Sequence, residues 1–243
     1  MRSVQAVWRF LRVLAWVLHG YWRIRREFAT LDKTAQAREV EAWAQQMLRI
    51  LGIEVRIEGE PAHGPVLLAA NHISWLDIVV MHAARHCRFV AKSEIRHWPV
   101  LGTLTTAGQS LYIERASSRD AMRVVHQMHE ALRQGDVLAV FPEASTGDGL
   151  SLLPFHGNLL QAAISADAPI QPVALRFVDA ATGAVSFAPC YVADDTLLGS
   201  LWRTLCAPPL LACVRYGALE HAEGRSRRQW AEGLRESVQR LLK

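Results

Sequence analysis

The sequence predicts an α/β domain, with a mixed central sheet flanked by helices, behind an amphipathic two-helix element at the amino terminus. Two observations lead to this fold class. From residue 52 onward, strand-like segments alternate with helical ones, and such alternation is typical of a sheet covered by helices. Over residues 1–51, the apolar residues recur at helical spacing instead. A chain of 243 residues that is 51% hydrophobic suits one large domain with this appendage.

Seven segments of the main domain have the composition and length of strands. They span residues 53–57, 66–70, 88–91, 110–113, 137–141, 170–177 and 210–216. The clearest helix between them covers residues 118–133, because Ser117 and Asp120 have the spacing of a capping box and Gly135 follows the last apolar position. A helix is also expected at 74–83, and an amphipathic helix at 226–242 closes the chain.

The first 26 residues are expected to form a helix with a narrow polar face. Its polar residues recur three, four or seven positions apart, and nearly all the others are apolar; the polar residues are Gln5, Arg9, Arg12, His19 and Arg23. This pattern predicts a helix that lies in a membrane interface. A membrane span would bring Arg9 and Arg12 into hydrocarbon at roughly 2.5–3.5 kcal/mol each. The alternative is an amphipathic helix docked on its own domain.

A second helix is predicted at residues 34–51, ending at Gly52, which is a typical C-cap. The two helices together make residues 1–51 a membrane-association element. Three of the eight tryptophans fall within the first of these helices, and such amphipathic rings favour the headgroup boundary of a membrane.

Composition argues against several classes of site and partner. The four cysteines form no CxxC pair and no regular spacing, so we predict neither a disulfide framework nor a zinc site, and we expect a reducing compartment. His126 and His129 lack a matching third ligand, and no metal site is predicted. The net charge of +4 comes with arginines spread along the chain. That distribution favours anionic lipid or a phosphate-bearing substrate over nucleic acid.

A histidine and an aspartate five residues apart lie at a predicted strand-to-helix junction. His72 follows the buried strand 66–70, and Asp77 falls near the start of the next helix. On one continuous helix the two side chains would point about 140° apart, so they meet only if His72 sits in the turn and Asp77 reaches back. The carboxylate would then fix the imidazole tautomer while His72 accepts a hydroxyl proton as general base. Neither Ser74 nor Ser145 lies in a Gly-x-Ser-x-Gly elbow, which argues against a serine hydrolase.

This junction, Asn71-His-Ile-Ser-Trp-Leu-Asp77, is the first of four motifs found between about residues 50 and 220. The others are Gly108-Gln-Ser-Leu-Tyr-Ile-Glu-Arg115, Phe141-Pro-Glu-Ala-Ser145 and Ile170-Gln-Pro172, with Ala91-Lys-Ser-Glu94 as a connecting pattern. In these motifs the sequence resembles the glycerolipid acyltransferase family, which includes the lysophosphatidic acid acyltransferases. The resemblance implies a mixed α/β catalytic domain, assigned here to residues 52–243.

The resemblance also implies the chemistry and its setting. The co-substrate would be acyl-CoA or acyl-carrier protein, with no cofactor, and the acceptor would be a membrane lysolipid. From the amphipathic first helix and the expected reducing compartment, we expect the enzyme to be peripheral or monotopic on the cytoplasmic face of the membrane. His72 would be the general base and Asp77 its orienting partner. The residues expected to bind substrate are Arg115, as a phosphate or headgroup ligand, Glu143, which would shape the acceptor site, and Lys92, Ser145 and Thr146.

The third motif departs from the family's usual Phe-Pro-Glu-Gly-Thr-Arg. Ala144 replaces the glycine, so the backbone is expected either to avoid positive φ there or to tolerate strain. Thr146 stands where a phosphate-binding arginine is usual, and the stretch that follows it is similar to the branch of the family that acylates lyso-ornithine lipid. The expected acceptor is 1-acyl-sn-glycerol-3-phosphate, which would give phosphatidic acid. The alternatives are lyso-ornithine lipid or another lysolipid and, outside enzymes, an inactive lipid-binding protein.

Overall fold

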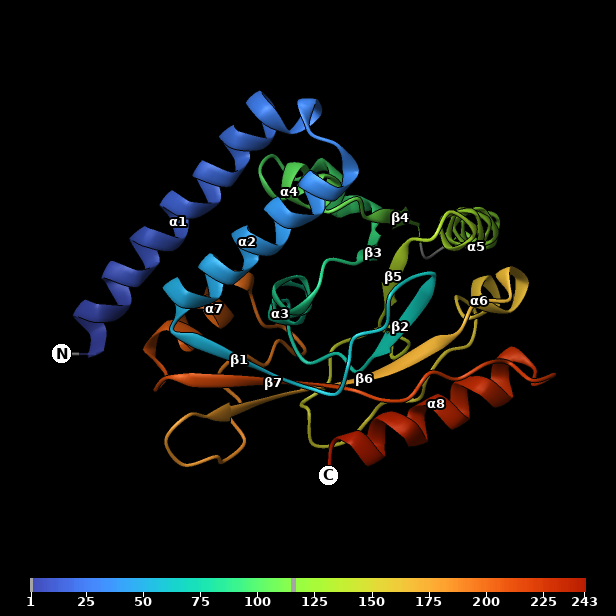
Figure 1. Cartoon of the computed structure of the whole chain (residues 1–243). Coiled ribbons are helices and arrows are strands. Elements are labelled where there is room, and N and C mark those ends of the chain that lie inside the picture. The colour runs from blue at the N-terminus through green and yellow to red at the C-terminus, as the bar shows by residue number, and fades with distance from the viewer. Residues whose placement is uncertain (1, 115–116) are drawn as a thin grey trace.

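A computed structural model describes residues 2–114 and 117–243, and it contains a seven-stranded mixed sheet (Figure 1). The strand order is β1-β7-β6-β2-β5-β3-β4. Neighbouring strands are parallel except β6 and β7, which are antiparallel. The strands are β1 (Ile53–Glu58), β2 (Val66–Ala70), β3 (Arg88–Lys92), β4 (Leu111–Ile113), β5 (Val137–Val140), β6 (Ile170–Asp179) and β7 (Leu210–Tyr216). All seven predicted strands are therefore found, with ends that differ by at most two residues.

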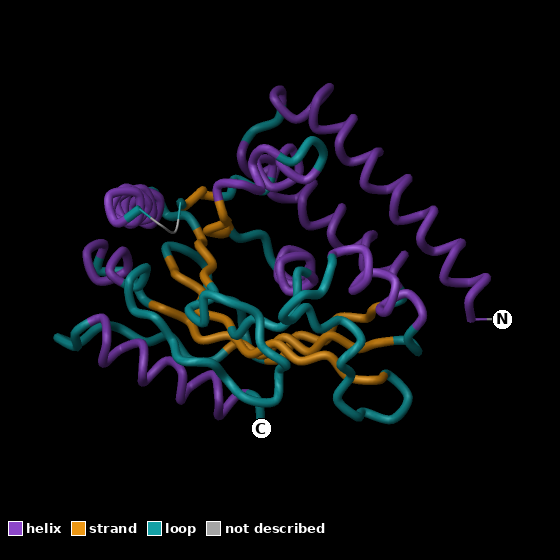
Figure 2. Tube along the Cα trace, turned by 180° about the vertical axis from the view of Figure 1, so that it is seen from behind, coloured by secondary structure: helices purple, strands orange, loops and turns teal. Residues whose placement is uncertain are grey.

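Helices cover both faces of the sheet, as Figures 1 and 2 show from opposite sides. Helices α1 to α4 lie on one side, α8 lies on the other, and α5 and α6 lie near one end. The helices are α1 (Arg2–Glu27), α2 (Lys33–Leu51), α3 (Leu76–Ala84), α4 (Leu101–Ala107), α5 (Ser118–Arg133), α6 (Gln161–Ala166), α7 (Leu197–Cys206) and α8 (Arg227–Leu241), with 3-10 turns η1 (Phe28–Thr30) and η2 (Ser93–His97). The predicted α/β architecture is confirmed.

The central strand β2 is buried on both faces. All five of its residues are buried, and alternate side chains enter two different cores: Val66, Leu68 and Ala70 face the core built with α2 and α3, and Leu67 and Ala69 face the core built with α5 and α8. A parallel strand with helices on both faces has this continuous apolar composition. After Val66–Ala70, the chain leaves the sheet with the polar residues Asn71 and His72.

Local capping residues set several helix ends as the sequence predicts. Gly52 ends α2 with a φ of 77°, in the left-handed region that glycine adopts without strain. At the start of α5, the Ser117 hydroxyl accepts a hydrogen bond from the Asp120 backbone N–H. The Asp120 carboxylate, however, accepts from the Glu114 N–H rather than returning to Ser117. Only half of the expected capping box is therefore formed at this end.

Helix α1 has two apolar faces rather than one. Ala6 and Val13 are buried against the domain, and Trp16 and Trp43 exchange indole-to-carbonyl hydrogen bonds of 3.1 and 3.3 Å that join α1 to α2. A second stripe remains exposed: Val4, Val7, Trp8, Leu11, Leu14, Leu18 and Trp22. Docking on the domain and an outward apolar face therefore coexist in one helix. Among the described residues, no helix is both long and apolar enough to cross a membrane.

Asn71 continues the sheet with its side chain after the backbone has turned away. Its amide nitrogen donates to the Leu175 carbonyl at 3.0 Å, and its amide oxygen accepts from the Leu175 N–H at 2.7 Å. These two bonds replace one step of the ladder between β2 and β6, which ends at the pair Ala70 and Val173. Because the Asn71 side chain pairs with the backbone groups of Leu175 in β6, the main chain can leave the sheet and carry His72 into the turn.

Replacing Asn71 with Ala should lower the free energy of unfolding by about 2–4 kcal/mol, because both backbone groups of Leu175 would be left unpaired in the core. Denaturant unfolding of the purified protein measures this loss. As a control, Gln161→Ala removes an amide that bonds Ser165 at the surface and should change stability by no more than about 0.5 kcal/mol. Equal small effects of the two substitutions would contradict the structural role given to Asn71.

Candidate active site

His72 and Asp77 meet at the turn between β2 and α3. The His72 Nδ1 lies 2.8 Å from the Asp77 Oδ2, and Asp77 is in the first turn of α3. This is the geometry that the five-residue spacing required, with the histidine in the turn and the aspartate reaching back. Because the carboxylate accepts the Nδ1 proton, the Nε2 of a neutral His72 is left as a proton acceptor. The catalytic roles of both residues stay predictions.

The Asp77 carboxylate also holds the turn itself. Its Oδ2 accepts from the backbone N–H groups of Ile73 at 2.6 Å and Ser74 at 2.9 Å, in addition to the imidazole. The side chain is fully buried, and its Oδ1 has no hydrogen-bond partner among the described residues. One oxygen therefore fixes both the backbone of the turn and the orientation of the histidine ring.

Phe141 stacks on the His72 ring. The two ring centroids are 3.9 Å apart and the planes differ by 7°. Phe141 belongs to the third sequence motif, but nothing in the motif indicated that its ring would lie against the histidine. The stack and the bond to Asp77 together restrict rotation of the imidazole. A second restraint acts on the backbone, where the Gly147 N–H donates to the His72 carbonyl at 2.8 Å.

Glu143 ties the turn to the loop that follows β5. Its two oxygens accept from the backbone N–H groups of His72 and Leu153, each at 2.7 Å. Burial raises the pKa of Glu143 above its usual value, although these two hydrogen bonds lower it in part. With both oxygens bonded to backbone, Glu143 has the geometry of a positioning residue. A contact between Glu143 and the acceptor stays a prediction.

The loop before α7 covers the turn, and sequence reasoning did not identify it. The Ser74 hydroxyl donates to the Pro189 carbonyl at 2.5 Å, and the Tyr191 N–H donates to the Ile73 carbonyl at 3.1 Å. The Thr146 hydroxyl donates to the Tyr191 carbonyl. This loop carries no recognisable motif, and only the folded chain brings it to His72.

The other predicted substrate-binding residues have different positions. Lys92, at the end of β3, is exposed and lines the same cavity as His72, Ser145 and Thr146. Arg115 lies outside the described residues. Ala144 has a φ of 59°, so the expectation that the backbone would avoid positive φ is wrong, and the stated alternative, tolerated strain, applies. A residue other than glycine costs about 1 kcal/mol or more in this region.

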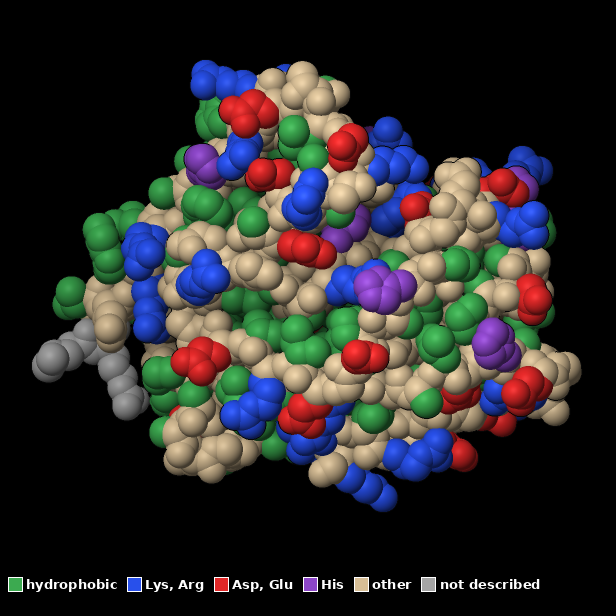
Figure 3. Space-filling model, in the orientation of Figure 1, with side chains coloured by type: hydrophobic (Ala, Val, Ile, Leu, Met, Phe, Trp, Pro, Cys, Tyr) green, Lys and Arg blue, Asp and Glu red, His purple; other side chains and the backbone are tan. Residues whose placement is uncertain are grey.

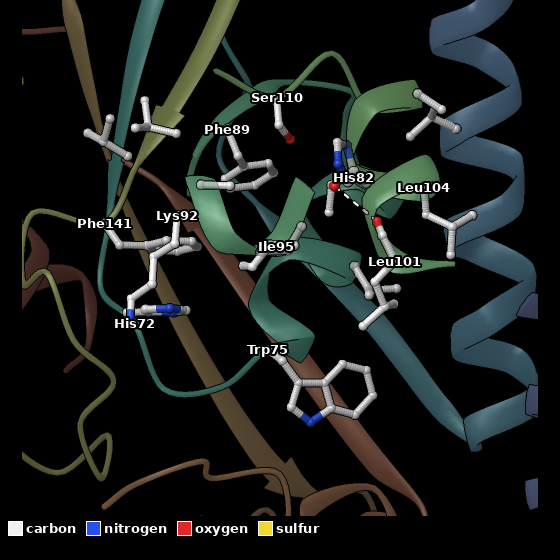
Figure 4. A pocket seen from close by; sticks show the side chains of 18 of the residues that line it. His72, Trp75, His82, Phe89, Lys92, Ile95, Leu101, Leu104, Ser110 and Phe141 are labelled. Atoms are coloured by element: carbon white, nitrogen blue, oxygen red, sulfur yellow. Dashed lines mark hydrogen bonds between the residues drawn. The ribbon is translucent and has the colours of Figure 1, made fainter. Parts of the chain in front are cut away.

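A cavity of about 1680 Å³ opens beside His72, larger than the range of roughly 300–1,000 Å³ typical of sites for drug-sized ligands. Its walls come from α1, α2, α3, β3, α4 and the loop after β5. Figure 4 shows His72 and Lys92 in one part of this cavity and His82, Leu104 and Ser110 in another. A space of this size, lined mostly by apolar side chains and reaching the His72–Asp77 pair through His72, suits a long apolar ligand with a reactive polar end.

No group of three or more potential metal ligands occurs among the described residues. The chemistry that the described side chains offer is proton transfer at His72. The buried Asp77 carboxylate supports it by bonding both the imidazole and the backbone N–H groups of the turn. General-base activation of a hydroxyl needs no protein nucleophile when the acceptor attacks an activated acyl group directly.

Comparisons with known proteins identify the sequences that this chain is similar to. A family model described as Acyltransferase matches residues 52–176. A 1-acyl-sn-glycerol-3-phosphate acyltransferase of Neisseria gonorrhoeae is 38% identical over 193 residues, covering 79% of this chain and 75% of that protein. A lyso-ornithine lipid O-acyltransferase of Pseudomonas aeruginosa is 34% identical over 196 residues, covering 80% and 73%.

A solved structure supports the fold. The crystal structure of the 1-acyl-sn-glycerophosphate acyltransferase from Thermotoga maritima aligns with a TM-score of 0.68 at 19% identity, over 96% of each chain. The family match spans more than half of this chain, and the sequence relatives align over about three quarters of their own length. The chain therefore belongs to the Acyltransferase family, and it is an O-acyltransferase.

Proposed function

We propose that the protein transfers a fatty acyl group from acyl-CoA or acyl-carrier protein to the free hydroxyl of a lysolipid, with 1-acyl-sn-glycerol-3-phosphate as the first candidate acceptor. The observation that carries the proposal is the His72–Asp77 pair, bonded at 2.8 Å, with His72 in the wall of a large, mostly apolar cavity. The names of the two relatives support a lysolipid acceptor.

The transfer proceeds by direct attack. The His72 Nε2 accepts the proton of the lysolipid hydroxyl as its oxygen bonds to the thioester carbonyl carbon. The carbon–sulfur bond then breaks, and the thiolate leaves with the proton returned from the imidazolium. Asp77 stabilises that imidazolium through Nδ1. No acyl-enzyme forms, and the products are the diacyl lipid and the free thiol of the donor.

His72→Ala should lower kcat for acyl transfer by roughly 10²- to 10⁴-fold, because the general base is removed. Purified enzyme, oleoyl-CoA and 1-oleoyl-sn-glycerol-3-phosphate in detergent provide the assay, with thiol release and lipid product both measured. His221→Ala removes an exposed histidine outside the cavity and should keep full activity. Transfer that survives in the His72 variant would refute the mechanism. Donor-dependent release of free fatty acid by wild type, with no lipid product, would indicate a hydrolase.

The acceptor headgroup is the less constrained part of the proposal. The Thr146 hydroxyl donates to the Tyr191 carbonyl, so this position holds a loop in place instead of offering a positive charge. Three described Lys or Arg residues line the cavity: Arg23, Lys92 and Arg227. Arg23 is paired with Glu27 and Glu39 at 3.4 and 3.0 Å. Lys92 extends from β3 in the direction of His72 (Figure 4), and we assign it to the acceptor phosphate.

Lyso-ornithine lipid is the second candidate, and the uncharged Thr146 is the observation that favours it. Offering both lysolipids in parallel to wild type and to Lys92→Gln tests the ranking. For the phosphate-bearing acceptor, KM should rise about tenfold in Lys92→Gln, because a charge-assisted hydrogen bond is lost. Lys33→Gln, which removes an exposed lysine outside the cavity, should leave KM unchanged. Acylation of lyso-ornithine lipid alone would reverse the ranking, and inactivity toward every lysolipid would favour a lipid-binding protein.

We also propose that α1 lies in the membrane interface. Its exposed stripe includes Trp8, Leu11 and Trp22, which are 61%, 52% and 55% exposed. Figure 3 shows hydrophobic and basic side chains interspersed on the side of the molecule along which α1 runs. Apolar insertion combined with attraction to anionic headgroups is how interfacial helices bind. The four cysteines are free, which fits the reducing cytoplasmic side.

A triple substitution of Trp8, Leu11 and Trp22 by Ser should weaken binding to phosphatidylglycerol vesicles on the order of a hundredfold, because three apolar side chains no longer enter the membrane. Vesicle sedimentation measures the affinity. The substitutions leave the buried stripe of α1 intact, so thermal unfolding should change little. The matched control replaces three exposed apolar residues elsewhere, Leu150, Phe187 and Leu219. Undiminished sedimentation of the α1 variant would place the membrane contact elsewhere.

A further inference from the structure

One face of α3 forms a wall of the cavity and changes character along its length. Trp75, Ile78, Val79 and His82 all line the cavity, and their spacing of i, i+3, i+4 and i+7 puts them on one side of the helix. The first three are predominantly apolar, and the fourth is an imidazole. An apolar ligand that runs along α3 away from His72 therefore meets a polar group at the end of the stripe.

His82 is a buried polar group without a partner. It is 9% exposed, its Nδ1 has no hydrogen-bond partner, and no hydrogen bond of either ring nitrogen is found among the described residues. It packs edge-on against Phe89, with ring centroids 5.1 Å apart, and stacks on His86 at 5.4 Å. Burial, with a smaller effect of His86, lowers the pKa of His82 to about 3. The ring is therefore neutral at physiological pH and offers one donor and one acceptor.

The distance of His82 along α3 can be compared with the length of an extended acyl chain. His82 lies seven positions after Trp75, which is about 10 Å along a helix. A fully extended chain advances about 1.2 Å per bond, since three bonds span one residue. A chain that passes Trp75 and follows α3 thus reaches His82 about eight or nine bonds further on. His82 and Ser110 both line the cavity, and Figure 4 labels them in the same part of the view, apart from His72.

We propose that His82 and Ser110 make a polar inner end to the part of the cavity that holds the acyl chain, and that they select against chains long enough to cover them. A shorter chain leaves the imidazole in contact with water, whereas a longer chain buries it unpaired. Leaving a buried polar group without a partner is unfavourable by an amount comparable to the gain from adding one or two methylene groups. This inference rests on the proposed acyl transfer and deepens it by naming a determinant of chain length.

The test compares donors from octanoyl-CoA to stearoyl-CoA with wild-type enzyme and with His82→Leu. The ratio of kcat/KM for stearoyl-CoA to that for octanoyl-CoA should rise about tenfold in the variant, because the long chain no longer buries an unpaired imidazole. Ser110→Ala should move the ratio in the same direction by a smaller factor, and His82→Asn, which keeps a polar group, should stay near wild type.

His86→Leu is the matched control, because His86 stacks on His82 but does not line the cavity. Its ratio should equal that of wild type. An unchanged ratio in both His82→Leu and Ser110→Ala, or a uniform fall for every donor in the two variants, would overturn the inference. Failure of the proposed function is distinguishable, since wild-type enzyme would then acylate no lysolipid with any donor. If His82→Leu does not fold, Ser110→Ala alone decides the outcome.

Discussion

The carboxylate of Asp77 holds together the turn on which the site depends. One of its oxygens accepts the imidazole and two consecutive backbone N–H groups, so the direction of the histidine and the path of the main chain are set by the same atom. The buried position excludes competing water, which strengthens these charge-assisted bonds. Without Asp77, three donors in the turn between β2 and α3 would lose their acceptor together.

The surrounding elements hold this turn from separate directions. Asn71 anchors it to β6, Glu143 anchors it to the loop after β5, and Tyr191 anchors it to the segment before α7. Each contact uses a backbone group of residues 71–73 or of their partners in the sheet. Fixing the backbone from several sides orders the His72 ring without any ligand, and in our proposal this preorganisation contributes to the catalytic rate.

The amino-terminal helices contribute to the cavity wall, and α1 also presents an exposed apolar stripe. Val13 and Met47 are buried in the core shared with the sheet and also line the cavity, while the opposite stripe of α1 is exposed. The proposed boundary between residues 1–51 and 52–243 stays a prediction, but the two parts share one core. In our proposal the cavity that receives a lipid chain is bounded by the helix that contacts the bilayer, which brings an insoluble substrate close to His72.

Sequence alone determined the seven strands, five of the helices and the candidate pair; α4, α6 and α7 were not predicted. The apolar runs predicted all seven strands, and the five-residue spacing of His72 and Asp77 required a turn if the two side chains were to meet, because both patterns are local. The stack of Phe141 on His72, the bonds that occupy both oxygens of Glu143, the loop at Tyr191 and the placement of His82 in the cavity were decided by the tertiary structure. Each joins segments far apart in the chain, and one sequence holds no periodicity that records such contacts.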